Sequence, residues 1–205
     1  MSNTIMPDRR QPQIDPDPEP CFDSTVLNHS PSDNSAPLAD DQRYLLWQSA
    51  AGHTTEHHIQ CAKWMRHLTP GLEQLTGRML DELAERLGLE PLMIGVCWAD
   101  DAEIKSLNSQ FREQDKPTNI LSFTSDEPEY NGDLVLGYEV ICTEAEQMGI
   151  SVADHLAHLL LHGTLHLLGY DHIDDKDADI MEQLEISLLD FVQIANPYPD
   201  KGAEE

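Results

Sequence analysis

The sequence predicts an α/β fold of the α+β type, because short apolar runs rich in strand-forming residues alternate with longer segments that have the periodicity of amphipathic helices. The chain has 205 residues, and 40% of them are hydrophobic, which is enough for the core of one domain. We therefore expect a single folded domain over residues 41–195, between an N-terminal arm, residues 1–40, and a flexible tail, residues 196–205.

The arm, residues 1–40, is expected to be disordered. It contains seven of the thirteen prolines and no glycine, so it cannot bury enough apolar surface to offset the entropy lost on ordering. Neither the arm nor the most apolar run, residues 156–168, has the pattern of a signal peptide or a membrane span. The four cysteines are scattered without a C-x-x-C pair, which suits reduced thiols. We expect a cytoplasmic protein that does not bind membranes.

The chain is strongly acidic, with 38 acidic and 12 basic residues. Residues 1–45 contain 8 of the acidic and 3 of the basic residues. Residues 46–205 therefore contain 30 acidic and 9 basic residues, a net charge of −21. A surface of this sign repels nucleic-acid backbones and anionic lipids. We therefore expect no binding to DNA, and only local recognition of any other polyanion.

The first elements differ in how clearly the sequence defines them. Within residues 41–68, the segments YLLW and HHIQCAKWM could each be a strand, and nothing local decides between them. Residues 69–87 are a clear core-facing helix, with Thr69 as N-cap, Pro70 in the first turn and Gly88 as the stop. Residues 92–98 form a short apolar run that is typical of a buried strand.

The remaining elements alternate between strands and helices. Asp100 or Asp101 caps a helix that places Ile104, Leu107 and Phe111 on one side, and the loop FREQDKP follows. Strands are predicted over residues 119–123 and 133–137, and helices over residues 144–148, 152–168 and 178–192. The last of these helices is expected to pack inward through Ile180, Leu184 and Leu188.

The segment HGTLHLLGYDH, residues 162–172, has the spacing with which metzincin proteases hold zinc. Residues four apart lie on the same face of a helix, so His162 and His166 can reach one ion. Gly169 can adopt the left-handed conformation that turns the chain and brings His172 back to the same point. Three neutral imidazoles suit one Zn²⁺ ion per chain and leave the fourth coordination position open, as in catalytic sites.

Gly163 stands where these proteases have the glutamate that transfers protons during peptide hydrolysis. Without that base a degenerate peptidase is disfavoured, whereas a phosphodiester, whose leaving oxygen a metal can assist, is a feasible substrate. Inert, hydrogen-bonded core histidines are the alternative, which the spacing and the glycine together disfavour. We expect His158 to support the ligands or to belong to the core, and His155 to be solvated or to cap the helix.

Three motifs in order resemble the YbeY family of bacterial metal-dependent endoribonucleases: LNSQFREQDKPTNILSF (107–123), GDLVLG (132–137) and HGTLHLLGYDH. The resemblance covers roughly residues 70–192. It implies a small mixed sheet of about four strands flanked by five or six helices, with a metzincin-like metal-site helix. It also implies an RNase specific for single strands that acts in ribosomal RNA maturation, notably at the 3′ end of the small-subunit RNA, and in ribosome quality control. By motif position it places the zinc ligands on His162, His166 and His172, and the essential arginine on Arg112.

Arg112 and Lys116 lie, with Lys105, beside one predicted strand end, where a guanidinium could clamp a phosphate. An ordinary charged loop is an equally good interpretation of these residues alone. The resemblance favours a catalytic role for Arg112 and leaves Lys116 as a candidate substrate-binding residue. The acidic residues of segment 172–185 are expected to favour a helix N-terminus and to face solvent, without a second metal site.

The leading hypothesis is therefore a zinc endoribonuclease that acts on single-stranded RNA, including ribosomal RNA. Since the net charge disfavours binding of naked RNA, we expect recognition through a ribosomal particle or a ribosome-associated protein. The alternative is a ribosome assembly factor whose zinc is mainly structural and whose cleavage is incidental.

Overall fold

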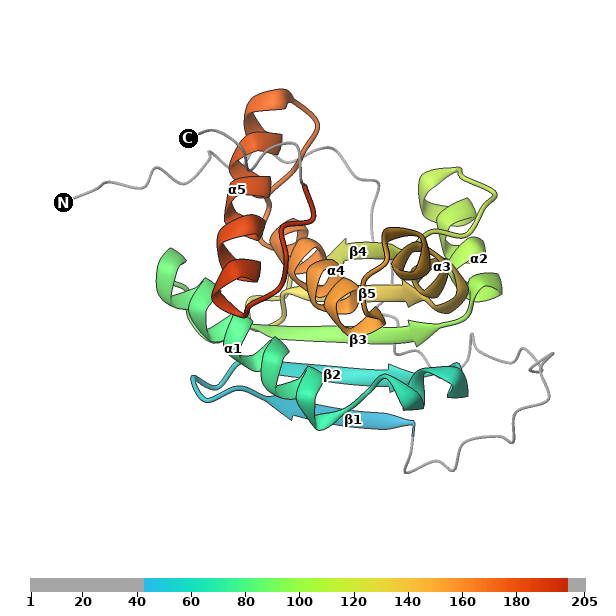
Figure 1. Ribbon diagram of the computed structural model, residues 1–205, viewed down its shortest axis with the longest axis horizontal. Coiled ribbons are helices and arrows are strands. Elements are labelled where there is room, and N and C mark those ends of the chain that lie inside the picture. The colour runs from blue at the N-terminus through green and yellow to red at the C-terminus, as the bar shows by residue number, and fades with distance from the viewer. Residues whose placement is uncertain (1–42, 199–205) are drawn as a thin grey trace. The chain divides into compact units, whose positions relative to one another are not determined.

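A computed structural model describes residues 43–198, so the arm predicted for residues 1–40 lies outside the described part. Its centre is a five-stranded mixed sheet with the strand order β1-β2-β3-β5-β4 (Figure 1). The strands are β1 (Tyr44–Gln48), β2 (Thr54–Ile59), β3 (Met93–Ala99), β4 (Ile120–Thr124) and β5 (Gly132–Gly137). The three central strands are parallel, and the edge strands β1 and β4 are antiparallel to their neighbours.

Both segments that the sequence left open within residues 41–68 contribute a strand. YLLW lies in β1, and the start of HHIQCAKWM lies in β2, while a short 3-10 helix, η2 (Ala62–Arg66), follows it. The sheet thus has five strands where about four were expected, and its mixed character is confirmed.

Five α-helices accompany the sheet: α1 (Pro70–Leu87), α2 (Asp101–Arg112), α3 (Tyr138–Met148), α4 (Val152–Leu167) and α5 (Asp175–Phe191). α1 and α4 pack side by side on one face of the sheet, and α5 packs on both of them from outside (Figure 1). α2 contacts the opposite face, where Phe111 meets Phe123 of β4 with 5.2 Å between ring centroids. Every helix of residues 43–198 is too short or too polar to cross a membrane.

The helix ends use the capping residues that the sequence predicts. The Thr69 side chain accepts a hydrogen bond from the Leu72 N–H, and Asp100 accepts from the N–H groups of Ala102 and Glu103. Gly88 ends α1 in the left-handed conformation, with φ 65°. Ser151 caps α4, a signal that the sequence reasoning did not use, and so fixes where the metal-site helix begins.

One prediction about a helix face and one about the start of a loop were wrong. Ile180 is 50% exposed, because the inner face of α5 is formed by Met181, Leu188 and Leu189. Phe111 is 41% exposed and belongs, with Arg112, to the last turn of α2 instead of to a loop.

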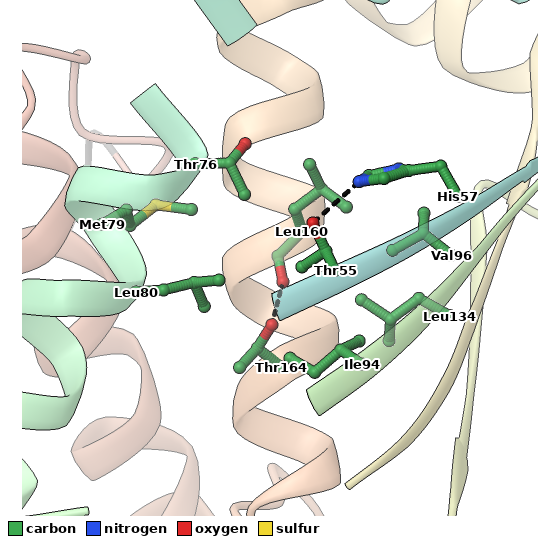
Figure 2. A pocket seen from close by; sticks show the side chains of 10 residues that line it. All are labelled: Thr55, His57, Thr76, Met79, Leu80, Ile94, Val96, Leu134, Leu160 and Thr164. Carbon is green, nitrogen blue, oxygen red and sulfur yellow. Dashed lines mark hydrogen bonds between the residues drawn. The ribbon is translucent and has the colours of Figure 1, made fainter. Parts of the chain in front are cut away.

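A small cavity of about 10 Å³ lies between α1, α4 and the sheet (Figure 2). Its wall includes Thr55 and His57, which are hydrogen-bonded to each other, and Thr164, whose hydroxyl donates to the Leu160 carbonyl. This volume is about the space of one water molecule. The cavity cannot take a nucleotide, and none of the three motif histidines lines it.

Candidate metal centre

α4 and the turn after it bring the three motif histidines together. The Nε2 atoms of His162 and His166 lie 3.1 Å apart. Gly169, with φ 86°, turns the chain so that the ring of His172 lies 5.6 Å from that of His162 and 5.0 Å from that of His166, measured between centroids. One ligand atom from each histidine lies within 4.8 Å of the others, so the cluster could hold a metal ion.

The hydrogen bonds on the far side of the rings fix where the protons of His162 and His166 are. Nδ1 of His162 lies 2.7 Å from Oε1 of Glu185, and Nδ1 of His166 lies 3.0 Å from the Tyr170 carbonyl oxygen. An ionised carboxylate and a carbonyl can only accept, so both Nδ1 atoms donate a proton, and in the neutral form of each ring the Nε2 atom carries the lone pair. When both rings are neutral, two lone pairs face each other across 3.1 Å, and this contact is favourable only with a metal ion or a proton between the two nitrogens.

This geometry fits a zinc ion. With Zn–N distances of ~2.0–2.1 Å, two imidazole nitrogens of a tetrahedral site lie about 3.3–3.4 Å apart, close to the distance between His162 and His166. Burial, and then the charges of His162 and His172, lower the pKa of His166 to about 4. His166 is therefore neutral at neutral pH, which is the form that binds metals.

Gly163 faces the sheet and not the histidine cluster. A Cβ atom at this position would lie 2.7 Å from Cδ2 of Leu134, 2.8 Å from Cδ1 of Ile120 and 3.2 Å from Oγ of Ser122. No side chain fits there without displacing β4 and β5 residues. The close packing of α4 on the sheet thus explains why the protease glutamate is absent at position 163. This helix cannot present a base from that position.

Glu185 is a residue of the centre that the sequence reasoning missed. It was expected among the solvent-facing acids of segment 172–185, but it is 0% exposed. Burial alone would raise its pKa, but hydrogen bonds from His158, His162 and Tyr198 outweigh burial and lower the pKa to about 2, so the carboxylate stays ionised. A signal was present, because Glu185 lies four residues after Met181 and three before Leu188 and so falls on the apolar face of its helix.

The other two helix histidines take different positions. His158 lies behind the cluster with Nε2 3.4 Å from Oε2 of Glu185, and His158, His162 and Glu185 form a second group of potential ligand atoms within 4.8 Å of one another. The expectation that His155 is solvated or caps the helix was wrong. It is 2% exposed, because it faces α3, where Glu144 lies 2.8 Å from its Nε2 atom.

Arg112 and Lys116 are exposed at the end of α2 and in the turn that follows. Asn108 shapes this turn, since its Nδ2 atom donates to the Lys116 carbonyl over 2.8 Å. Phe123 of β4 contacts the residue before Arg112, whereas Ser122, on the other face of β4, borders Gly163. The helix that ends with Arg112 and the helix that carries His162 and His166 therefore contact β4 from opposite faces, and no hydrogen bond or ion pair joins the arginine to the three histidines within residues 43–198.

Comparison with known proteins decides the family. The family model described as endoribonuclease YbeY matches residues 58–193. The chain belongs to the YbeY family. This match includes all three motifs, so the resemblance seen in the sequence is confirmed.

Curated YbeY relatives match over much of their own length. Endoribonuclease YbeY of Paramagnetospirillum magneticum is 41% identical over 158 residues, which cover 70% of this chain and 94% of the relative. That of Francisella philomiragia is 43% identical over 125 residues, which cover 57% and 79%. A solved structure, the solution structure of TM1509 from Thermotoga maritima, is 25% identical and covers 72% of this chain and 97% of its own, with a TM-score of 0.47.

Proposed function

We propose that this YbeY-family chain is a zinc-dependent endoribonuclease in which His162, His166 and His172 hold one Zn²⁺ ion. The observation that carries the proposal is the pair of Nε2 atoms of His162 and His166 that face each other at 3.1 Å, while both Nδ1 atoms lie against hydrogen-bond acceptors. Membership of a family described as endoribonucleases supplies the reaction class.

Each residue of the centre then has a separate task. A bound zinc ion would polarise the scissile phosphate or lower the pKa of a bound water. His162 and His166 direct their Nε2 atoms at the ion, and His172 completes the set from the turn. Arg112, which is exposed at the end of α2, binds a phosphate oxygen in bidentate fashion, and Lys116 adds a second positive charge to the same RNA backbone.

The substrate is single-stranded RNA, with the 3′ end of the small-subunit ribosomal RNA as the physiological target and ribosome quality control as a second task in the cytoplasm. The three histidines are half-buried or exposed, and a site that is reached from the surface suits a flexible single strand. Residues 46–205 have a net charge of −21, so affinity for free RNA is weak and sensitive to salt. A ribosomal particle or a ribosome-associated protein supplies the remaining recognition.

The test combines zinc content with cleavage of single-stranded and duplex RNA. Wild-type protein is expected to bind one zinc per chain and to cut the single strand. His166→Ala loses both properties, whereas Arg112→Ala keeps zinc and loses cleavage. Arg78→Ala, which removes an exposed arginine of α1, is the matched control and keeps both. Cleavage that persists in zinc-free His166→Ala contradicts the proposal.

The acidity of the chain favours one competing function, a ribosome assembly factor with a mainly structural zinc. Such a factor would meet RNA only within a particle, and Arg112 would not be needed for its main task. If ribosomal RNA processing in cells survives Arg112→Ala while cleavage in vitro is lost, the assembly-factor hypothesis replaces the nuclease.

A further inference from the structure

We propose that Glu185 is the positioning residue of the metal centre, and that Tyr198 holds it in place from the C-terminal segment. Glu185 orients His162 and compensates the charge of the ion without touching it. This inference rests on the proposed function, since it concerns how His162 binds zinc.

The first argument is that both carboxylate oxygens of Glu185 have hydrogen-bond partners. Oε1 accepts from Nδ1 of His162, and Oε2 accepts from the Tyr198 hydroxyl and lies 3.4 Å from Nε2 of His158. In the neutral imidazole of His162 this contact places the proton on Nδ1, so that the Nε2 lone pair faces His166. A histidine that binds a metal commonly donates its other N–H to a carboxylate, which orients the ring and makes it a stronger ligand.

The second argument is the cost of burying this charge. Glu185 lies on the apolar face of α5 near Met181 and Leu188, and it is fully buried. A buried carboxylate is costly unless a positive charge balances it. Within residues 43–198 its ion pairs are with His158 and His162, not with a lysine or arginine. A divalent cation bound to Nε2 of His162 would supply the missing positive charge, because only the imidazole ring would separate it from the carboxylate.

The third argument is the place of Tyr198. Tyr198 lies in the segment, residues 196–205, that was expected to be a flexible tail. Its hydroxyl nevertheless donates to Glu185, and its ring packs edge-on against that of His158, with 5.8 Å between the centroids. The Asn196 side chain accepts the Tyr198 N–H over 2.7 Å and forms the turn that directs the ring inward. Tyr198 therefore prevents the carboxylate from rotating away from His162.

A second metal ion among His158, His162 and Glu185 is the competing explanation of the same contacts. That ion would have to take the proton position between Nδ1 of His162 and Oε1 of Glu185. The two explanations differ in stoichiometry, because the positioning role requires one ion per chain and the competing explanation requires two.

The experiment compares Glu185→Gln with Glu144→Gln, a matched control. Glu144 also contacts a histidine of α4 at 2.8 Å, but that histidine, His155, lies outside the cluster. Zinc affinity is measured by competition with a chelator, and the folded state is checked by urea denaturation. We expect a loss of affinity of about 10–100-fold for Glu185→Gln, no change for Glu144→Gln, and a smaller loss for Tyr198→Phe.

A second readout uses the metal-free wild-type protein, so that it does not depend on how well a variant folds. Nitrogen-15 NMR of the imidazoles should show His162 protonated at Nδ1 and unprotonated at Nε2. The inference fails if the ring shows the opposite tautomer, if folded Glu185→Gln binds zinc like the wild type, or if two ions bind per chain. A wild-type protein that binds no zinc at all would instead overturn the proposed function itself.

Discussion

Replacing Gly163 by alanine measures how closely the metal-site helix packs on the sheet. The added methyl would lie 2.7 Å from Leu134 and 2.8 Å from Ile120, both closer than carbon atoms can approach without a shift. Overpacking of a buried position costs about 1–3 kcal/mol, and the better helix propensity of alanine returns at most about 1 kcal/mol. We expect a net loss of up to about 2 kcal/mol in the free energy of unfolding.

Gly77→Ala is the control, because Gly77 is also inside a helix and a Cβ there would meet Ser49 at an ordinary 3.4 Å. It should stabilise the protein by up to about 1 kcal/mol through helix propensity alone. Urea denaturation with an unchanged m-value gives both differences. If Gly163→Ala proves as stable as Gly77→Ala, the close packing is wrong, and position 163 has room for a side chain after all.

Three further predictions concern other parts of the chain. Burial lowers the pKa of His57 to about 3, whereas in the unfolded chain the pKa is about 6.5. Because the unfolded state takes up the proton first, the free energy of unfolding falls as the pH drops below about 6.5, by about 2 kcal/mol at about pH 5. His57→Gln should flatten this part of the stability profile measured with urea. Gly95→Ala should leave little soluble protein at expression, because its Cβ would collide with Asp133 and the Tyr130 hydroxyl; normal yield and melting temperature would contradict this. Asn108→Ala should release the turn that carries Lys116, so that RNA cleavage falls while zinc content stays unchanged. A loss of zinc would contradict an effect confined to this turn.

The local signals in the sequence predicted most of the fold. Thr69, Asp100 and Gly88 set helix ends through capping chemistry that acts within a few residues, so their positions could be inferred without tertiary structure. The edge strand β1 could not be inferred in this way. It forms by pairing with β2, and a short half-exposed strand owes its stability to its partner more than to its own residues.

The candidate site was predictable where its residues lie on one helix and in the turn directly after it. His162, His166 and His172 follow a spacing with a mechanical reason, and the structure brings them together. Glu185 and Tyr198 reach the same centre from α5 and from the chain beyond it, and no sequence spacing encodes that contact. His155 shows the same limit, because only the packing of α3 against α4 reveals that it is buried beside Glu144.

X-ray absorption spectroscopy at the zinc edge of the loaded protein tests the central claim most directly. Three imidazole nitrogens and one exchangeable oxygen at about 2.0–2.1 Å are predicted, since only three protein ligands converge and one position stays open to RNA. A fourth protein ligand, or a sulfur at about 2.3 Å, would close that position and contradict the proposal that this centre cleaves RNA.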